Sequence, residues 1–227
     1  YMKPGIQVCP VGSVCFVRSD DRLLYYCEMG NDTLRPIRYK DFKSTSFVTA
    51  FDVISSSLLL AGNKDGIVYT VSKSGATNIL FSMHSQVTCI KALKTGSFVI
   101  CTANGDIKII DGKTYKEIGT YKISGFDTFI TSVAELNNSV LAFGLRSQGV
   151  AELSYREGIR YNAVHKLVNK SCSSLCQDSF GNLWVGHSYG GITVRLAQSI
   201  DYNETTLPEK LNTKKVLSVV EVGDITY

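Results

Sequence analysis

Three histidines, His84, His165 and His187, are the side chains of this sequence best suited to bind a metal ion or to transfer protons at neutral pH. None has a second ligand beside it at the spacing of a zinc site, which needs several His, Cys or carboxylate groups converging on one point. Cys172 and Cys176 lie four residues apart on one face of a predicted strand, with no histidine nearby, and are better explained as core packing. We therefore predict no metal ion and no other cofactor.

We find no arrangement of residues in the sequence that indicates a catalysed reaction. His-Glu-x-x-His and the Walker phosphate-binding loop do not occur, and Glu135, Glu152 and Glu157 are isolated on separate predicted strands and loops. The glycine-rich run GHSYGG, residues 186–191, precedes a strand, whereas a phosphate-binding loop opens a helix. We predict that this run is a hairpin turn and that the protein is not an enzyme. A hydrolase or lyase built on the same fold is a weaker alternative.

Composition favours strands and sets limits on partners. The 227 residues are 44% hydrophobic and 19% charged, and 12 Tyr and 10 Phe favour β-structure. No apolar run reaches the roughly 18 residues of a membrane span. The net charge of +4 comes from scattered basic residues, which argues against a nucleic-acid binder. Seven cysteines without metal spacing indicate a reducing, intracellular compartment, cytoplasmic or other.

The run FVICTANGDIKII, residues 98–110, predicts a β-hairpin. Asn104-Gly105 between alternating apolar segments is a strong hairpin signal, because both central residues of the expected turn need positive φ. Ile110-Asp111 then leads into another turn. The pattern resembles the core of a WD40 repeat in a degenerate form, since the family has Trp-Asp where Ile110-Asp111 stands here. The resemblance implies a β-propeller, an architecture that hosts many unrelated functions.

A second stretch resembles another type of propeller. The run FGNLWVG, residues 180–186, is similar to the repeat of sensor propellers in bacterial two-component proteins, and it occurs once. It contains Trp184, the single tryptophan of the chain, which we expect to fill space between blades.

Two independent markers recur along the chain with one period. The residue before the third strand of each unit recurs at separations of 40, 43 and 42, and the start of the first strand at separations of 39, 43, 42 and 44. The first set is Gly66, Asp106, Gly149 and Gly191, and the second is Val48, Val87, Ile130, Cys172 and Val216. The period fits the roughly 40–45 residues of a WD40 blade.

We therefore predict an all-β fold, a β-propeller of four-stranded antiparallel blades forming a single domain over residues 1–227. Five complete blades and part of a sixth are expected, at residues 5–40, 47–82, 87–124, 130–167, 172–208 and 216–227. At roughly 42 residues a blade, the chain is too short to close a ring of six. Because an open array leaves unpaired strand edges, we expect strands from outside this sequence, as part of a longer polypeptide or from another chain, to complete the ring.

The resemblance to WD40 proteins implies that the loop after each outer strand and the turn between strands two and three meet at one rim, the usual docking face. The partner-binding residues predicted there are Lys64, His84, Phe126, Arg146, His187 and Tyr189. Basic residues beside aromatic ones could bind an acidic or phosphorylated peptide, or an anionic lipid, through charge-assisted hydrogen bonds. The alternative is that they are solvated loop residues. Asp65, Asp106 and Asp127 share these loops and reduce the positive field, which argues against nucleic acid.

Two functions follow as hypotheses. The first is a non-catalytic scaffold for protein–protein interaction, which binds a partner peptide or domain on the rim within a larger protein or complex. The second is a regulatory or sensory propeller of a multidomain signalling enzyme, such as a kinase. A kinase or GTPase motif beside the propeller in the longer polypeptide would favour the second.

Overall fold

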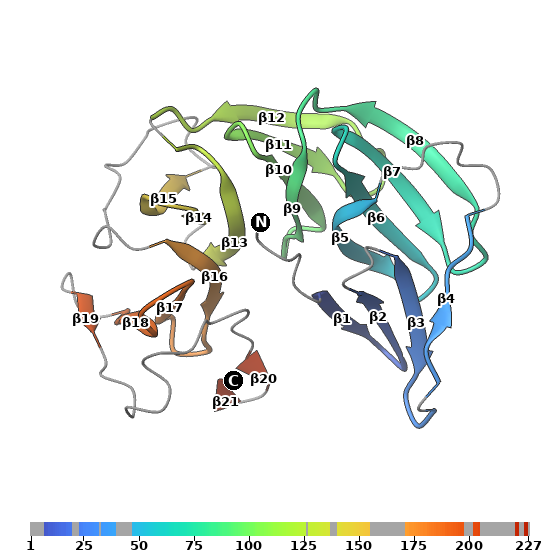
Figure 1. Ribbon diagram of the computed structural model, residues 1–227, viewed down its shortest axis with the longest axis horizontal. Coiled ribbons are helices and arrows are strands. Elements are labelled where there is room, and N and C mark those ends of the chain that lie inside the picture. The colour runs from blue at the N-terminus through green and yellow to red at the C-terminus, as the bar shows by residue number, and fades with distance from the viewer. Residues whose placement is uncertain are drawn as a thin grey trace. The chain divides into compact units, whose positions relative to one another are not determined.

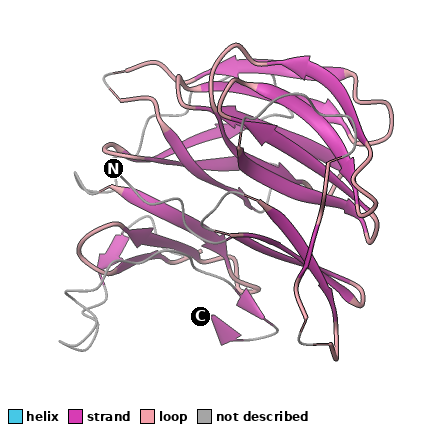
Figure 2. Cartoon of the chain, turned by 45° about the vertical axis from the view of Figure 1, so that its right-hand side comes forward, coloured by secondary structure: helices cyan, strands magenta, loops and turns pink. Residues whose placement is uncertain are grey.

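The computed structural model describes residues 7–19, 23–31, 33–39, 47–125, 127–136, 140–154, 171–197, 202–204, 221–222 and 225–226. These residues form strands, turns and loops, and none of them is helical (Figure 2). Accordingly, nothing in the described ranges is a helix long and apolar enough to cross a membrane. The chain divides into two compact units, Tyr1–Thr120 and Tyr121–Tyr227, each built of antiparallel sheets.

Unit 1 contains three sheets of four antiparallel strands, which we call blades 1 to 3, and in each the strands follow one another in sequence order (Figure 1). Blade 1 comprises β1 (Gln7–Val11), β2 (Val14–Arg18), β3 (Leu24–Glu28) and β4 (Arg35–Pro36). Blade 2 comprises β5 (Val48–Ser55), β6 (Leu58–Asn63), β7 (Ile67–Ser72) and β8 (Thr77–Ser82). Blade 3 comprises β9 (Val87–Ala92), β10 (Ser97–Thr102), β11 (Asp106–Asp111) and β12 (Glu117–Lys122), whose last residues pass the division between the units.

Unit 2 repeats the plan. Blade 4 comprises β13 (Ile130–Leu136), β14 (Val140–Leu145) and β15 (Gly149–Ser154), and blade 5 comprises β16 (Cys172–Gln177), β17 (Leu183–His187), β18 (Ile192–Arg195) and β19 (Tyr202–Glu204). The strands β20 (Glu221–Val222) and β21 (Ile225–Thr226) pair with each other. The outer strand predicted for blade 4 and the strand predicted at 216–220 lie outside the described residues. Five successive antiparallel sheets confirm the predicted β-propeller class.

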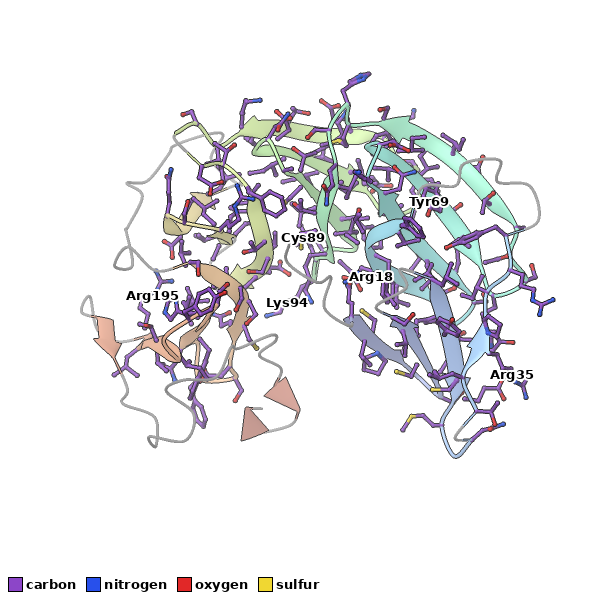
Figure 3. The ribbon with its side chains drawn as sticks, viewed as in Figure 1. Arg18, Arg35, Tyr69, Cys89, Lys94 and Arg195 are labelled. Carbon is purple, nitrogen blue, oxygen red and sulfur yellow. The ribbon has the colours of Figure 1, made fainter. Side chains whose placement is uncertain are left out.

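Neighbouring blades pack through their first strands and the apolar side chains behind them. The strand β5 lies between β1 and β9 in unit 1, and β13 packs on β16 in unit 2. The core between blades 1 and 2 includes Phe16, Leu24 and Tyr69, the last labelled in Figure 3 and only 1% exposed. In blades 2 and 3 the second strand is covered on both sides, so the sequences of β6 and β10 are nearly continuous apolar runs rather than alternating ones.

The hairpin predicted at 98–110 is present, but its turn differs from the expected one. The strands β10 and β11 pair with Cys101 opposite Ile107. Gly105 has a φ of 80° and donates its N–H to Thr102 O at 3.2 Å, whereas Asn104 is not among the residues with positive φ. The loop therefore has the three residues 103–105 that the sequence predicted, but it ends in one left-handed glycine in place of the two positive-φ residues expected at Asn104 and Gly105.

A hydroxyl group recurs at one position in four blades. The second residue of the first strand is Thr49, Thr88, Thr131 or Ser173, and each hydroxyl donates to the carbonyl thirteen residues later in the second strand. Thr131 Oγ1 also lies 2.8 Å from Cys172 O, the carbonyl that opens β16 of the next blade. Thr49 makes the corresponding contact with Val87 O. The hydroxyls of Thr49 and Thr131 therefore join adjacent blades.

Replacing Thr131 by Val should lower the free energy of unfolding by about 1 kcal/mol, because the isosteric change removes the contacts to Gly144 O at 3.0 Å and Cys172 O at 2.8 Å. Thr88→Val is the matched control, since among the described residues the Thr88 hydroxyl bonds only to Cys101 O, at 3.4 Å. Urea unfolding followed by circular dichroism measures both. Equal losses in the two variants would contradict a role for Thr131 in joining blades.

Candidate binding surface

The rim predicted from the sequence corresponds to one end of each blade, which we call the turn end. It carries the turn between the second and third strands and the segment that precedes the first strand. Backbone hydrogen bonds hold these two pieces together: Ala103 N to Gln86 O at 2.9 Å in blade 3, and Arg146 N to Phe129 O at 3.0 Å in blade 4. The turn and the preceding loop therefore lie side by side within a blade, as predicted.

In unit 1 the turn ends present Lys64, in the turn of blade 2, and His84, in the segment that precedes β9 of blade 3. Both side chains are exposed, and a hydrogen bond of 2.8 Å from Met83 N to Gly66 O joins their two loops. His84 has a φ of 56°, which is uncommon for a residue other than glycine. Lys64 lies in a turn fixed by Asn63, whose Oδ1 accepts the N–H groups of Asp65 and Ile67. These two predicted residues are thus accessible and held on ordered loops.

In unit 2 the turn end of blade 4 holds Arg146 in a fixed orientation. Its Nε donates to Asp127 Oδ2 at 3.1 Å, and its Nη2 donates to Asp127 Oδ1 at 3.3 Å. The guanidinium carbon lies 4.7 Å from the centroid of the Phe129 ring, which is a cation–π contact. The Arg146 side chain remains 51% exposed. A bidentate pair on an aromatic face orients the guanidinium before any partner arrives.

Asp127 is the acceptor that organises this end of blade 4. Besides Arg146, it accepts the Ser147 hydroxyl and the backbone N–H of Phe129. Desolvation by itself raises the pKa of Asp127, but hydrogen bonds from Ser147 and Arg146 more than offset it and hold the pKa below its ordinary value. The carboxylate is therefore ionised at neutral pH and compensates part of the Arg146 charge.

Tyr189 lies at the turn end of blade 5, beside blade 4 in the same unit. It occupies the turn between β17 and β18 and is 80% exposed. The neighbouring Ser188 N donates to Ser171 O at 3.1 Å, so this turn is attached to the segment before β16 in the same way as in blade 4. The turn ends of blades 4 and 5 together present an oriented Arg146 and a large exposed ring.

Two predicted residues do not belong to this accessible set. His187 is 1% exposed, and its Nε2 lies 2.8 Å from Thr193 Oγ1 across the hairpin, so its ring packs inside blade 5 and offers no surface to a partner. Phe126 lies outside the described residues. Sequence reasoning noticed Asp127 as a diluting charge but missed its pairing with Arg146, because nineteen residues separate the two.

One catalytic spacing also escaped the sequence reasoning. Residues 186–190, GHSYG, have the Gly-x-Ser-x-Gly pattern of a hydrolase nucleophile. That motif places its serine exposed between a strand and a helix, whereas Ser188 is 1% exposed and lies between the strands β17 and β18. Its hydroxyl has no hydrogen-bond partner among the described residues. The described ranges likewise contain no cluster of three His, Cys, Asp or Glu side chains that could hold a metal ion.

Comparison with known proteins gives one family match and two similar structures. The family described as "Two component regulator propeller" matches residues 166–189, which end in the turn that carries Tyr189. No curated protein matches the chain. The crystal structure of the computationally designed Ika8 protein has a TM-score of 0.65 at 16% identity, covering 83% of this chain and 57% of that one. The computationally designed Ika4 protein has a TM-score of 0.57 at 17% identity, covering 71% of this chain and 98% of that one. At such identities the likeness establishes the fold alone.

Proposed function

We propose that this propeller is a non-catalytic interaction module that binds an acidic or phosphorylated peptide at the turn end of blades 4 and 5. The observation that carries the proposal is the Arg146 guanidinium, which is held by Asp127, stacked on Phe129 and still half exposed. A side chain that is already oriented loses little conformational entropy on binding, so a hydrogen bond to an incoming anion is not offset by ordering. We also propose that the protein works in a reducing, intracellular compartment and that its blades are degenerate WD40 repeats.

The partner class follows from the chemistry of this surface. Nε and Nη2 donate to Asp127, and Nη1 makes no hydrogen bond to the described residues, so the outer edge of the guanidinium is open to a carboxylate or phosphate. Tyr189, at 80% exposure, supplies the large ring that peptide-binding surfaces favour. Because Asp127 compensates part of the charge, a single anionic group beside an apolar residue fits better than a polyanion such as nucleic acid.

Binding to a displayed peptide library tests the proposal. The wild-type chain should enrich peptides that pair an acidic or phosphorylated residue with an apolar one, and Arg146→Ala should weaken the selected peptides about tenfold, the equivalent of losing one charge-assisted hydrogen bond. Lys113→Ala is the matched control, because it removes one positive charge from an exposed turn between the third and fourth strands, away from the turn end. Unchanged affinity in Arg146→Ala, or an equal loss in Lys113→Ala, would exclude this surface.

A second candidate function is a sensory or regulatory propeller attached to a signalling enzyme. The family match at residues 166–189 favours it, because that family is described as a regulator propeller. The two candidates differ in what adjoins the propeller. A kinase or GTPase motif in the same polypeptide would support the second, and a polypeptide without any catalytic domain would leave the first.

A further inference from the structure

Two cysteines face each other directly across strands in blade 1. The register of β2 and β3 places Cys15 opposite Cys27. Hydrogen bonds from Met29 N to Ser13 O and from Ser19 N to Leu23 O lie two and four residues from the pair, so Cys15 and Cys27 occupy a hydrogen-bonded position of the ladder. Their Cα atoms are then about 5.5 Å apart, inside the range of about 4.4–6.8 Å that a disulfide spans. The Cβ atoms of a hydrogen-bonded pair also lie about 5.5 Å apart, so the two strands must draw about 1 Å closer for the S–S bond to close.

Within unit 1, the face of blade 1 that carries this pair is less enclosed than the matching faces of blades 2 and 3. The burial of β2 alternates, with Val14, Phe16 and Arg18 buried and Cys15 and Val17 half-buried, whereas the second strands of blades 2 to 4 are buried on both faces. The β1 residues paired with this half-buried row are exposed, whereas its partners on β3 are half-buried. Val8, which lies opposite Val17, is 54% exposed. Within unit 1, the Cys15 and Cys27 side chains are themselves half-buried rather than enclosed, so a small thiol reagent or disulfide can approach them.

We propose that Cys15 and Cys27 form a redox modification site, a dithiol that a low-molecular-weight disulfide such as oxidised glutathione converts reversibly into a cross-strand disulfide. One cysteine thiolate attacks the glutathione disulfide, giving a protein–glutathione mixed disulfide and one reduced glutathione. The second cysteine then attacks the mixed disulfide and releases the second glutathione. Two thiols lose two electrons and two protons, and one glutathione disulfide becomes two thiols, so the exchange balances.

The environment of the pair sets the rate of this exchange. Burial, and then the neighbouring Cys27 thiol, raise the pKa of Cys15, so little of it is thiolate at neutral pH. Exchange is therefore slow at neutral pH and accelerates as pH rises, because the thiolate is the nucleophile. Because Cys27 faces Cys15, its thiol is present at high effective concentration beside a mixed disulfide formed on Cys15.

The chain contains its own matched control in blade 3. Cys89 on β9, labelled in Figure 3, lies opposite Cys101 on β10. The hydrogen bond from Leu93 N to Ser97 O lies four residues away, so this pair also occupies a hydrogen-bonded position. Cys101, however, is 0% exposed, and burial raises its pKa well above the ordinary value. The two pairs share a directly opposite register and differ in access, and a β-bulge directly follows Cys101 in the blade 3 ladder.

The test is to incubate the native chain with oxidised glutathione, block remaining thiols with an alkylating reagent, and identify linked peptides by mass spectrometry. The expected result is a Cys15–Cys27 disulfide that dithiothreitol reverses, with Cys89 and Cys101 unlinked. In Cys27→Ser, Cys15 should instead accumulate a stable glutathione adduct, because the resolving thiol is gone. Recovery of Cys15 and Cys27 as free thiols, or as two separate adducts in the wild type, would overturn the proposal. Linkage of Cys89 to Cys101 at the same rate would also overturn it.

Discussion

Gly62→Ala should lower the free energy of unfolding by about 1–3 kcal/mol, although it adds a single methyl group. A Cβ built at Gly62, on β6, would lie 2.5 Å from Val87 Cγ1 and 2.6 Å from Val87 Cβ. Val87 begins β9 of the next blade and is 0% exposed, so it has no open space to move into. The substitution must therefore separate β6 from β9, where blades 2 and 3 share their core. Urea unfolding followed by circular dichroism measures the loss.

The partner residue supplies the control for this prediction. Val87→Ala removes Cγ1 and Cγ2, two of the three atoms nearest the added methyl group, and leaves a small cavity of its own. In the double variant the two defects should partly compensate, so the combined loss should fall short of the sum of the single losses by about 0.5–3 kcal/mol. Simple additivity would show that the cost of Gly62→Ala does not come from close approach of the blades.

The repeat made most of the fold predictable. The turns between successive strands contain glycine, serine or asparagine, and apolar residues alternate with polar ones in the outer strands. The order of the strands could therefore be predicted from the sequence. The recurring hydroxyl was visible too, since Thr49, Thr88, Thr131 and Ser173 each follow the first residue of a first strand. The role of this hydroxyl in joining blades could not be predicted from the sequence, because the second acceptor of Thr131, Cys172 O, belongs to the next blade.

The candidate site was less predictable than the fold, for a physical reason. Lys64, His84 and Tyr189 were placed correctly on exposed turns because turn position follows from local sequence. Local sequence does not show whether the side chain of a turn residue points outward. His187, the last residue of β17, points inward and contacts Thr193. The orientation of Arg146 depends on Asp127 and Phe129, from a segment that only the closed hairpin brings near.

Asp178→Asn should lower the free energy of unfolding by about 2–3 kcal/mol. Asp178 follows β16 and is 9% exposed, and its carboxylate accepts hydrogen bonds from Asn182 N at 2.8 Å and from Phe180 N at 3.1 Å. It also accepts Asn182 Nδ2 at 2.9 Å and Trp184 Nε1 at 2.8 Å. An asparagine amide would present N–H groups to some of these donors and leave them unpaired. Fluorescence of Trp184, the single tryptophan, reports the change directly, because its indole N–H is one of the donors.

Trp184→Phe separates the contribution of one donor from that of the whole turn. It keeps an aromatic ring in β17 but removes the indole N–H together with part of the half-buried ring, so its loss, measured by circular dichroism, should be smaller, about 1.5 kcal/mol. A loss in Trp184→Phe equal to that in Asp178→Asn would mean that ring packing, not the carboxylate, stabilises this turn.

The dependence on pH identifies the carboxylate as the source. Desolvation raises the pKa of Asp178, but hydrogen bonds from Trp184 and Asn182 outweigh it and leave the pKa below the ordinary value. Between the folded and unfolded pKa values the unfolded chain binds more protons, so the contribution of Asp178 is complete above about pH 4 and disappears as pH falls through the folded pKa. The difference in stability between the wild type and Asp178→Asn should therefore shrink below about pH 4. A difference that stays constant in acid would require a source other than ionised Asp178.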